Sequence, residues 1–396
     1  MSHPLPLAAL DRLPDYLETL RRYVGHETPT GDAAALDAFA DALVTDARAL
    51  GMTGGRVALG ADGEISGTGD AVVLDLPGRG PGASGGTGAE PALLLAHHDT
   101  VHPVGSLAGT VPLRLDGDGP DTAVLHGPGT YDMKGGIVVA LAALALLRDL
   151  ELDHRPVRLV STPDEEVGSP TSAALVRDTC RDVAYALGLE APLPDGTLKT
   201  SRRGSTRVRL LVDGLAAHAA VDPDAGVPAI DELVDQLLVV RALVAEHPDV
   251  LLNVGTVRGG TRTNVVAAHA QADLGLRFVT SEVEERVLAR LLALAPVRPG
   301  AEVQVQVLSR RPAWGPGTAA EDLLAAVAAA AGPVGQRVAG SAAPGAADTN
   351  ITGAAGVATL DGFGPLGGGA HAAGEHVRVR TLAERAALLA AVLHTL

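Results

Sequence analysis

Short apolar runs occur along the first part of the chain and predict strands. They cover residues 71–76, 92–96, 156–160 and 183–189. The run 92–96 is continuously apolar, which is typical of a strand buried on both faces of a sheet. Stretches with helical spacing separate these runs, so the pattern predicts an α/β unit built on a central sheet.

Apolar residues at helical spacing predict the helices of this unit. They cover residues 7–23, 33–50, 136–150 and 172–181. Pro14 predicts an early interruption of the first helix, because proline lacks the N–H that a helix interior needs.

The pattern changes near Thr200, where alternating apolar and polar residues replace the continuous runs. The order becomes strand, helix, strand, strand, helix and strand, over residues 205–214, 227–246, 250–257, 264–279, 281–294 and 302–308. This order is the split βαβ plan of a ferredoxin-like fold. Alternation, as in STRVRLLVDG, suits an antiparallel sheet with one wetter face.

The first pattern returns near the end of the chain, with helices predicted over residues 319–331 and 382–396. We therefore predict one mixed-sheet α/β domain that is divided by an insertion. Residues 1–201 and 311–396 form the larger domain, and residues 202–310 form an inserted α+β domain.

The composition supports a large core and limits the partners. The chain has 396 residues, of which 46% are hydrophobic and only 2% aromatic, so Leu, Val and Ala must fill the core. The formal net charge of −16 argues against nucleic acid and anionic membranes as partners.

Two further features bear on the cell compartment. Cys180 is the single cysteine, which excludes internal disulfides and a cysteine-rich metal cluster. The N-terminal residues do not form a signal-peptide pattern, and the longest apolar stretch, 137–147, is too short to span a bilayer. We expect a cytoplasmic protein without a membrane partner.

Acidic or histidine side chains follow three of the predicted strands. They are His97 with Asp99, Glu165 with Glu166, and Glu190. Open α/β sheets place their sites at the carboxyl ends of strands, so these endings predict a shared site at one sheet edge. Asp99 shares a face with His97 and can hold the ring of a ligating histidine. Adjacent glutamates point to different sides, so one can face a metal while the other faces water or substrate.

Glycine-rich segments carry two more candidates. Asp132 stands in GPGTYDMKGG before a predicted helix, and His371 stands in GGGAHAAGE. The first segment matches neither GxGxxG nor GxxxxGK[ST], so a metal-binding carboxylate suits it better than a phosphate cradle. We interpret His98 and His102 as residues that do not bind metal.

Together these residues give a ligand set of two histidines and three carboxylates: His97, Asp132, Glu166, Glu190 and His371. Such a set fits a pair of zinc ions that share one bridging aspartate. A two-metal centre still needs a general base, and Glu165 stands beside a ligand for that role.

The ordered motifs AHHDTV, GPGTYDMKGG, TPDEEVGS, LGLE and GGGAHAAGE resemble the metal-site motifs of the co-catalytic zinc exopeptidases. That family includes glutamate carboxypeptidases, acetylornithine deacetylase, succinyl-diaminopimelate desuccinylase and aminoacylase. The resemblance covers essentially the whole chain, and the glutamate carboxypeptidase branch is the most similar.

The resemblance implies two zinc ions per subunit, with cobalt or manganese as alternatives in the cell. It implies that His97 and Glu190 hold one ion, that Glu166 and His371 hold the other, and that Asp132 bridges them. It also implies that Asp99 orients His97 and that Glu165 activates the attacking water.

For the inserted domain, the resemblance implies a lid that also forms a homodimer. His218 would reach the active site of a partner subunit and stabilise the oxyanion. Asn264, Arg277 and Arg311 would contact substrate, although Arg310 could replace Arg311.

Several residues depart from the family pattern without removing a ligand. They leave the substrate and the lid geometry open, and they are Ala96 before His97, Ala219 and Ala220 after His218, Gly275 before Arg277, and Ala347 before Asp348.

The favoured hypothesis is a dinuclear zinc hydrolase that cleaves a peptide or N-acyl amide and releases an amino acid with a free carboxylate. The first alternative is an aminoacylase that deacylates small N-acyl amino acids. The second is a catalytically inactive dimeric binding protein on the same scaffold.

Overall fold

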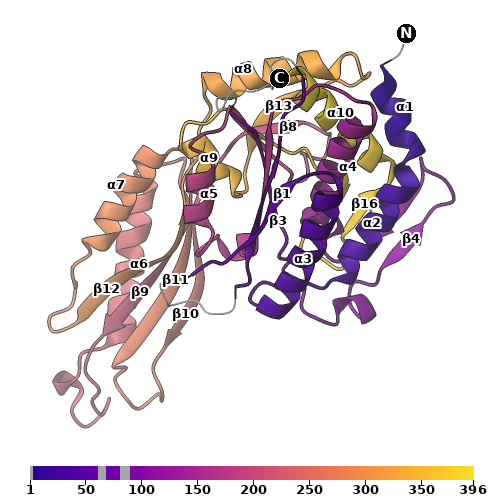
Figure 1. Ribbon diagram of the computed structural model, residues 1–396. Helices are drawn as coiled ribbons and strands as arrows, with labels where there is room; N and C mark the ends of the chain where they lie inside the picture. Colours follow the sequence, from indigo (N-terminus) through magenta and orange to yellow (C-terminus); the bar gives the residue numbers. More distant parts are fainter. Residues whose placement is uncertain (1–2, 61–67, 81–89) are drawn as a thin grey trace. The chain divides into compact units, whose positions relative to one another are not determined.

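The chain forms two compact units in a computed structural model that describes residues 3–60, 68–80 and 90–396 (Figure 1). The larger unit contains Met1–Ser201, Pro316–Ala343 and Ala347–Leu396, and the inserted unit contains Arg202–Gly315 and Pro344–Ala346. The inserted unit ends a few residues beyond the boundary set from sequence, because the backbone N–H groups and carbonyls of Arg202 and Trp314 bond each other.

An eight-stranded mixed sheet forms the centre of the larger unit. Its order is β1 (Thr53–Val57), β2 (Ala71–Leu76), β6 (Val157–Thr162), β3 (Ala92–His97), β7 (Tyr185–Gly188), β14 (Thr359–Asp361), β8 (Leu198–Arg202) and β13 (Gly340–Ala343). The neighbours β6, β3 and β7 are parallel, so their carboxyl ends meet at one edge. This arrangement confirms the α/β class that the apolar runs predict.

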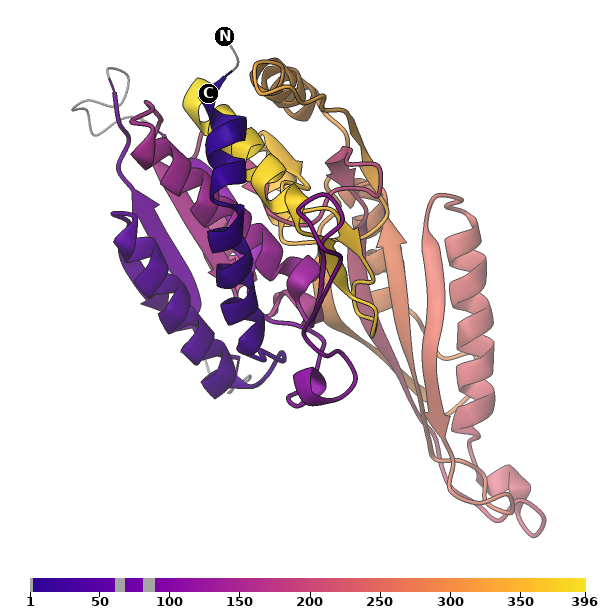
Figure 2. The same cartoon turned by 90° about the vertical axis from the view of Figure 1, so that its right-hand side faces the viewer.

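Helices cover both faces of this sheet, which explains why every residue of β3 is buried (Figure 1). One face packs against α1 (Pro4–Asp11), α2 (Leu13–Gly25), α3 (Ala33–Ala49), α4 (Gly135–Asp149), α8 (Thr318–Ala331) and α10 (Arg380–Thr395). The other face packs against α5 (Ala173–Thr179) and α9 (Thr349–Ala354). Figure 2 shows α1 beside α10, so the two ends of the chain meet in one helical layer.

The central helix α4 is apolar on nearly all sides. With the turn before it, residues Thr130–Asp149, it is long and apolar enough to cross a membrane by length and composition, which the shorter stretch 137–147 is not. However, 83% of the apolar 18-residue stretch within this range is buried inside the protein, as is typical of a core helix.

The first predicted helix is two helices in the structure. They are α1 and α2, and Pro14 lies in the first turn of α2 rather than inside a helix. Proline is well tolerated there, because the first N–H groups of a helix have no intrahelical acceptor. The predicted early interruption near Pro14 is therefore confirmed, since one helix ends at Asp11 and the next begins at Leu13.

Very short strands escape prediction from sequence. A four-stranded sheet is built from β15 (Gly367–Gly368), β16 (His376–Arg378), β5 (Val124–His126) and β4 (Arg114–Asp116). Strands of two or three residues cannot show a periodic pattern. This small sheet positions the loop that carries His371.

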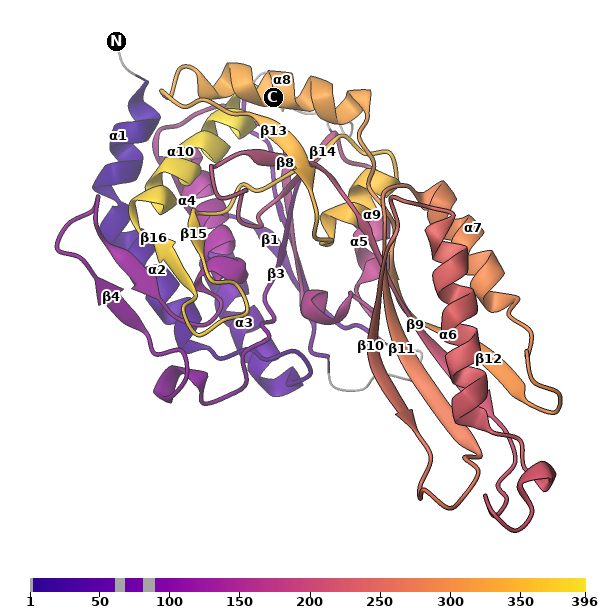
Figure 3. The ribbon, with the colours of Figure 1, turned by 180° about the vertical axis from the view of Figure 1, so that it is seen from behind.

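The inserted unit has the predicted ferredoxin-like order. Its strands are β9 (Gly204–Asp213), β10 (Leu251–Gly259), β11 (His269–Phe278) and β12 (Glu302–Arg311), in the order β10-β11-β9-β12, all antiparallel. Helices α6 (Ala229–Ala245) and α7 (Ser281–Leu292) lie on one face of this sheet (Figure 3). Strand β11 begins later than predicted, so Asn264 lies in the segment before it.

Candidate metal centre

The carboxyl ends of three parallel strands bring most of the candidate ligands together. His97 is the last residue of β3, Glu165 and Glu166 open a short 3₁₀ turn after β6, and Glu190 follows β7 by two residues. Because β6, β3 and β7 are adjacent and parallel, these side chains meet at one edge of the sheet.

Two loops add the remaining candidates to that edge. Asp132 lies in the turn Thr130–Lys134 that leads into α4. This turn follows Gly129, whose φ is +72° and whose added Cβ would lie 2.8 Å from Thr100 Cγ2. His371 lies between β15 and β16 and has a left-handed φ of 62°.

Asp132 stands at the centre of the cluster. Its Oδ1 lies 3.0 Å from His97 Nε2, and the same nitrogen lies 3.5 Å from Glu190 Oε1. Its Oδ2 lies 3.2 Å from His371 Nε2, which also lies 3.0 Å from Glu166 Oε2. The two oxygens of Asp132 therefore face two different histidine–glutamate pairs.

Asp99 connects His97 to the glutamate turn. Its buried Oδ1 lies 3.3 Å from His97 Nδ1 and accepts the Glu165 N–H at 3.1 Å. Its Oδ2 accepts the Glu166 N–H at 3.1 Å and the Thr30 hydroxyl at 2.7 Å. Asp99 thus positions the backbone of both glutamates as well as the histidine ring.

Two further buried aspartates, Asp164 and Asp348, form hydrogen bonds with residues on either side of the turn that carries Glu165 and Glu166. Asp164 Oδ2 accepts both the N–H and the hydroxyl of Thr171 at 2.7 Å. Asp348 accepts hydrogen bonds from Thr162 and from Ser169, the last residue of the turn motif. The departure at Ala347 leaves these bonds in place, because they involve only the Asp348 carboxylate.

The electrostatics of the cluster are dominated by its carboxylates. Hydrogen bonds to Asp132 and Glu166 raise the pKa of His371 to about 10. Burial alone would raise the pKa of Asp132, but the hydrogen bonds from His371 and His97 hold it well below its ordinary value. The site therefore attracts positive charge, which protons on the histidines supply and which metal ions could supply instead.

The donor set fits a metal centre. Glu166 Oε1 is buried and has no hydrogen-bond partner among the described residues, which is costly unless a cation faces it. The side-chain donor atoms of His97, Asp132 and Glu166 lie within 4.8 Å of one another, as do those of His97, Glu165 and Glu190. Imidazole nitrogens and carboxylate oxygens are typical zinc ligands.

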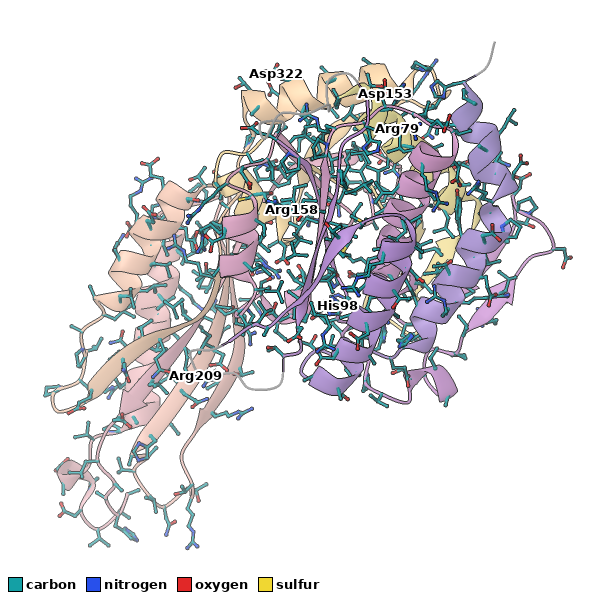
Figure 4. All side chains as sticks on the ribbon, in the orientation of Figure 1. Arg79, His98, Asp153, Arg158, Arg209 and Asp322 are labelled. Carbon is teal, nitrogen blue, oxygen red and sulfur yellow. The ribbon has the colours of Figure 1, made fainter. Side chains whose placement is uncertain are left out.

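The neighbouring histidines have other partners. His98, labelled in Figure 4, stacks on Phe39 with ring centroids 5.6 Å apart, and its Nδ1 lies 2.9 Å from Ser161 Oγ. His102 Nε2 lies 2.7 Å from Glu375 Oε2. The interpretation of both as residues that do not bind metal is compatible with these contacts.

In the inserted unit, His218 and Asn264 lie on adjacent backbone segments. The Ala219 N–H bonds the Asn264 carbonyl at 3.1 Å, and both side chains are exposed. His218 Nδ1 accepts the N–H groups of Ala220 and Val221 at 3.2 and 3.1 Å. Because Nδ1 accepts, a neutral His218 ring carries its proton on Nε2.

Two candidate arginines of the inserted unit share a sheet face. Arg277 on β11 and Arg311 on β12 both pair with Ser205 on the strand between them. Arg310 lies on the opposite face, where its Nε donates to the buried Glu284 of α7 at 2.9 Å. Arg310 therefore lies away from the face that Arg277 occupies, and Arg311 is the candidate on that face.

Sequence reasoning missed Thr30 and Glu375, which bind the backbone or side chains of ligand-bearing segments. Glu375 stands in the GGGAHAAGE segment, four residues after His371. Only that proximity could have drawn attention to it.

The fold and this cluster define a metallohydrolase that acts on peptide or amide bonds. Residues 93–395 match the profile of peptidase family M20/M25/M40. The chain belongs to this family.

Relatives and solved structures agree with that assignment. Carboxypeptidase G2 of Pseudomonas sp. strain RS-16 is 30% identical over 321 residues, which are 80% of this chain and 73% of that protein. Succinyl-diaminopimelate desuccinylase of Gluconacetobacter diazotrophicus is 29% identical over 361 residues, which are 82% of this chain and 88% of that protein. Aminopeptidase PepT of Bacillus cereus has the same fold, with a TM-score of 0.73, 20% identity and coverage of 97% of this chain and 98% of that chain.

Proposed function

We propose that this protein is a dinuclear zinc hydrolase that cleaves a peptide or N-acyl amide bond and releases an amino acid with a free carboxylate. The observation that carries the proposal is the position of Asp132, whose two oxygens face two separate histidine–glutamate pairs. His97 and Glu190 would hold one ion, and Glu166 and His371 the other, with Asp132 shared.

The bound metal pair would polarise the scissile carbonyl and acidify the attacking water near neutral pH. Glu165 has the position of the general base. Its side chain is 7% exposed, and its carboxylate belongs to the same group of donor atoms as His97 and Glu190. It would accept the proton of the attacking water and deliver it to the leaving nitrogen.

His218 is suited to donate a hydrogen bond to the developing oxyanion. Its Nδ1 is occupied by two backbone N–H groups, so the outward Nε2 carries the proton of the neutral ring. These bonds come from the backbone of residues 220 and 221, so the departure from the family pattern at Ala219 and Ala220 retains them. We assign this histidine to the active site of a partner subunit.

The inserted unit has the surface that a homodimer would need. Ile230, Val234 and Leu238 are 40, 52 and 61% exposed and recur every four residues along α6. Strand β10 is at the edge of its sheet, and its Leu251 and Val257 are 55 and 58% exposed. The exposed apolar residues of α6 and the unpaired backbone edge of β10 favour association with the same surface of a second copy of the chain.

The arginine face of the inserted unit favours a substrate carboxylate. Burial, together with the charge of Arg311, lowers the pKa of Arg277, so a bound anion would relieve an unfavourable environment. The Arg277 guanidinium forms no hydrogen bond or ion pair with other described residues, in contrast to Arg209 (Figure 4), which Asp273 holds at 2.6 Å. Arg277 is therefore available for a carboxylate, and Asn264 would be a second substrate contact.

A further arginine favours an acidic amino acid as the released product. Arg207 is exposed and pairs directly with Gly275, one row along the same sheet face from Arg277. An added Cβ at Gly275 would meet no atom within 4 Å, so this row leaves open space beside Arg207. A glutamate side chain could place its second carboxylate there.

The test is a panel of peptides and N-acyl amino acids that end in Glu, Asp, Arg or an apolar residue. We expect Glu to give the highest kcat/KM, by about 10–100-fold over an apolar end, since a charged hydrogen bond contributes about 1.5–3 kcal/mol. Efficient cleavage of small N-acetyl substrates but not peptides would favour the deacylase alternative, which the similarity to a desuccinylase supports. Fewer than one zinc ion per chain would favour an inactive binding protein.

A pair of variants checks the carboxylate site within that panel. Arg277→Gln should raise KM for every substrate by about 10-fold or more, because all of them carry the terminal carboxylate. Arg286→Gln removes the same charge from α7, where the side chain is 59% exposed, and serves as the matched control. An unchanged KM for Arg277→Gln would remove Arg277 from the substrate site.

A further inference from the structure

A buried carboxylate lies behind the metal centre and binds the loop that carries Asp132. Glu375 is 1% exposed. Its Oε1 accepts the N–H groups of Tyr131 and Asp132 at 2.9 and 3.0 Å, and its Oε2 accepts the Gly129 N–H at 3.1 Å. Three backbone donors from one short segment therefore converge on a single side chain.

The same carboxylate reaches the segment that follows His97. His102 lies in the loop after β3, and its Nε2 is 2.7 Å from Glu375 Oε2. The backbone of Glu375 adds two bonds, because its carbonyl accepts the Gly127 N–H at 3.2 Å and its N–H donates to the Ala372 carbonyl at 3.1 Å. Glu375 thus contacts all three segments that carry His97, Asp132 and His371.

Because the Glu375 carboxylate is buried, its hydrogen bonds to the three segments depend on one another. A carboxylate removed from water is unfavourable unless hydrogen bonds replace its hydration, and bonds to a charged acceptor are roughly twice as strong as neutral ones. The required donors lie in chain segments 246 and 273 residues away from Glu375. The stable state of this carboxylate is therefore the one in which all three segments have their native positions.

We propose that Glu375, assisted by His102, is a positioning residue that fixes the Asp132 loop between the two halves of the metal centre. The inference rests on the dinuclear site proposed above. Glu375 holds the backbone of Asp132 itself, whose side chain faces His97 on one side and His371 on the other. It touches neither substrate nor the reacting atoms, so its effect passes through the spacing of the ligands.

The variant Glu375→Gln separates this role from packing, because it keeps the shape of the side chain. The amide can accept hydrogen bonds on one side only, so its NH₂ group must face either the Gly129 N–H and His102, or the N–H groups of Tyr131 and Asp132. Loss of such a partner of metal ligands typically lowers metal affinity by about 10–100-fold. We expect the loss to be larger for the second zinc ion, since one histidine–glutamate pair can hold a single ion without the shared aspartate.

The experiment is a calorimetric titration of the metal-stripped protein with Zn²⁺. Glu27→Gln is the matched control, because Glu27 also accepts two backbone N–H groups at 2.8 Å, but from Gly105 and Leu107 at the start of the short turn Ser106–Ala108, which carries no candidate ligand. Thermal unfolding of each metal-free protein is measured in parallel. The kcat of Glu375→Gln should recover at high zinc, because the catalytic groups are intact, whereas a purely structural defect would not respond to metal.

Each outcome decides the inference. Weakened zinc binding in Glu375→Gln, with parental binding in Glu27→Gln and restored kcat at high zinc, supports it. Parental affinity for two ions in Glu375→Gln overturns this inference alone. A parent protein that binds fewer than two ions overturns the proposed metal centre as well. If Glu375→Gln does not fold, the variant His102→Ala takes its place, because it removes one donor to the Glu375 carboxylate. This variant must lower the affinity for the second zinc ion. Parental affinity in His102→Ala overturns the inference.

Discussion

Replacing Asp99 by asparagine tests whether the hydrogen bonds to the Asp99 carboxylate stabilise the segments that carry the candidate metal ligands. Four donors converge on this buried carboxylate, two of them the backbone N–H groups of Glu165 and Glu166, each at 3.1 Å but on different oxygens. An asparagine offers one oxygen and one NH₂ group, so in either orientation one of these backbone N–H groups loses its acceptor. The hydroxyl of Thr30 can rotate away, but a backbone N–H cannot.

The cost follows from these contacts. A buried donor without an acceptor costs about 1–3 kcal/mol, and loss of the charge from the remaining bonds adds about 1 kcal/mol. The charged form is favourable in its site, because burial raises the pKa of Asp99 but the bond to His97 and the N–H donors hold it below the ordinary value. We therefore expect Asp99→Asn to lower the free energy of unfolding of the metal-free protein by about 2–4 kcal/mol.

Chemical unfolding followed by far-ultraviolet circular dichroism is the suitable assay. The single tryptophan, Trp314, lies in the inserted unit, so its fluorescence would not report on the metal centre. Asp182→Asn is the control, because Asp182 pairs with Arg158 at 2.9 Å but is 67% exposed, and such surface pairs contribute less than about 1 kcal/mol. Equal stability of Asp99→Asn and Asp182→Asn would refute the reasoning.

Three other predictions concern metal, lid and assembly. Chelation of the metal should abolish hydrolysis. Added zinc at roughly 100 times its Kd should restore activity and stabilise the fold by about 2.7 kcal/mol, measured by thermal unfolding. A chelated enzyme that keeps its activity would contradict the metal-dependent reaction. His218→Ala should lower kcat by about 100–1000-fold with little change in KM, measured by steady-state kinetics; an equal kcat would exclude an oxyanion contact. Val234→Asp should convert a dimer to monomers in light scattering, whereas Leu7→Asp, on the larger unit and 62% exposed, should not; a dimer that survives Val234→Asp would place the interface elsewhere.

The sequence predicts the architecture well wherever a segment is long enough to show a periodic pattern of apolar residues. The continuous run 92–96 and the alternating run 205–214 have different periods, and they became a fully buried strand and a strand with one wetter face. The strands of two or three residues around the His371 loop have no readable period, so they were missed. The interruption near Pro14 was predicted correctly, because proline fits the first turn of a helix but not its interior.

The candidate ligands could be named from sequence because each follows a strand or a glycine-rich turn. Their pairing could not be derived from spacing, since His371 is far along the chain from Asp132 and Glu166, whose oxygens it approaches within 3.2 Å. The role of Glu375 could not be predicted for the same reason, because its partner His102 is 273 residues away. Such supports depend on the three-dimensional convergence of loops, which local patterns do not encode.

The most direct test of the proposed chemistry is the turnover and metal content of Glu165→Gln. Glu165 lies close enough to His97 and Glu190 to be a ligand instead of a base, so the two roles must be separated. If Glu165 is the base, the variant keeps two zinc ions per chain while kcat falls by about 100–10,000-fold, the usual contribution of a general base. A variant that keeps the parental kcat, or one that loses a zinc ion together with its activity, would contradict this assignment.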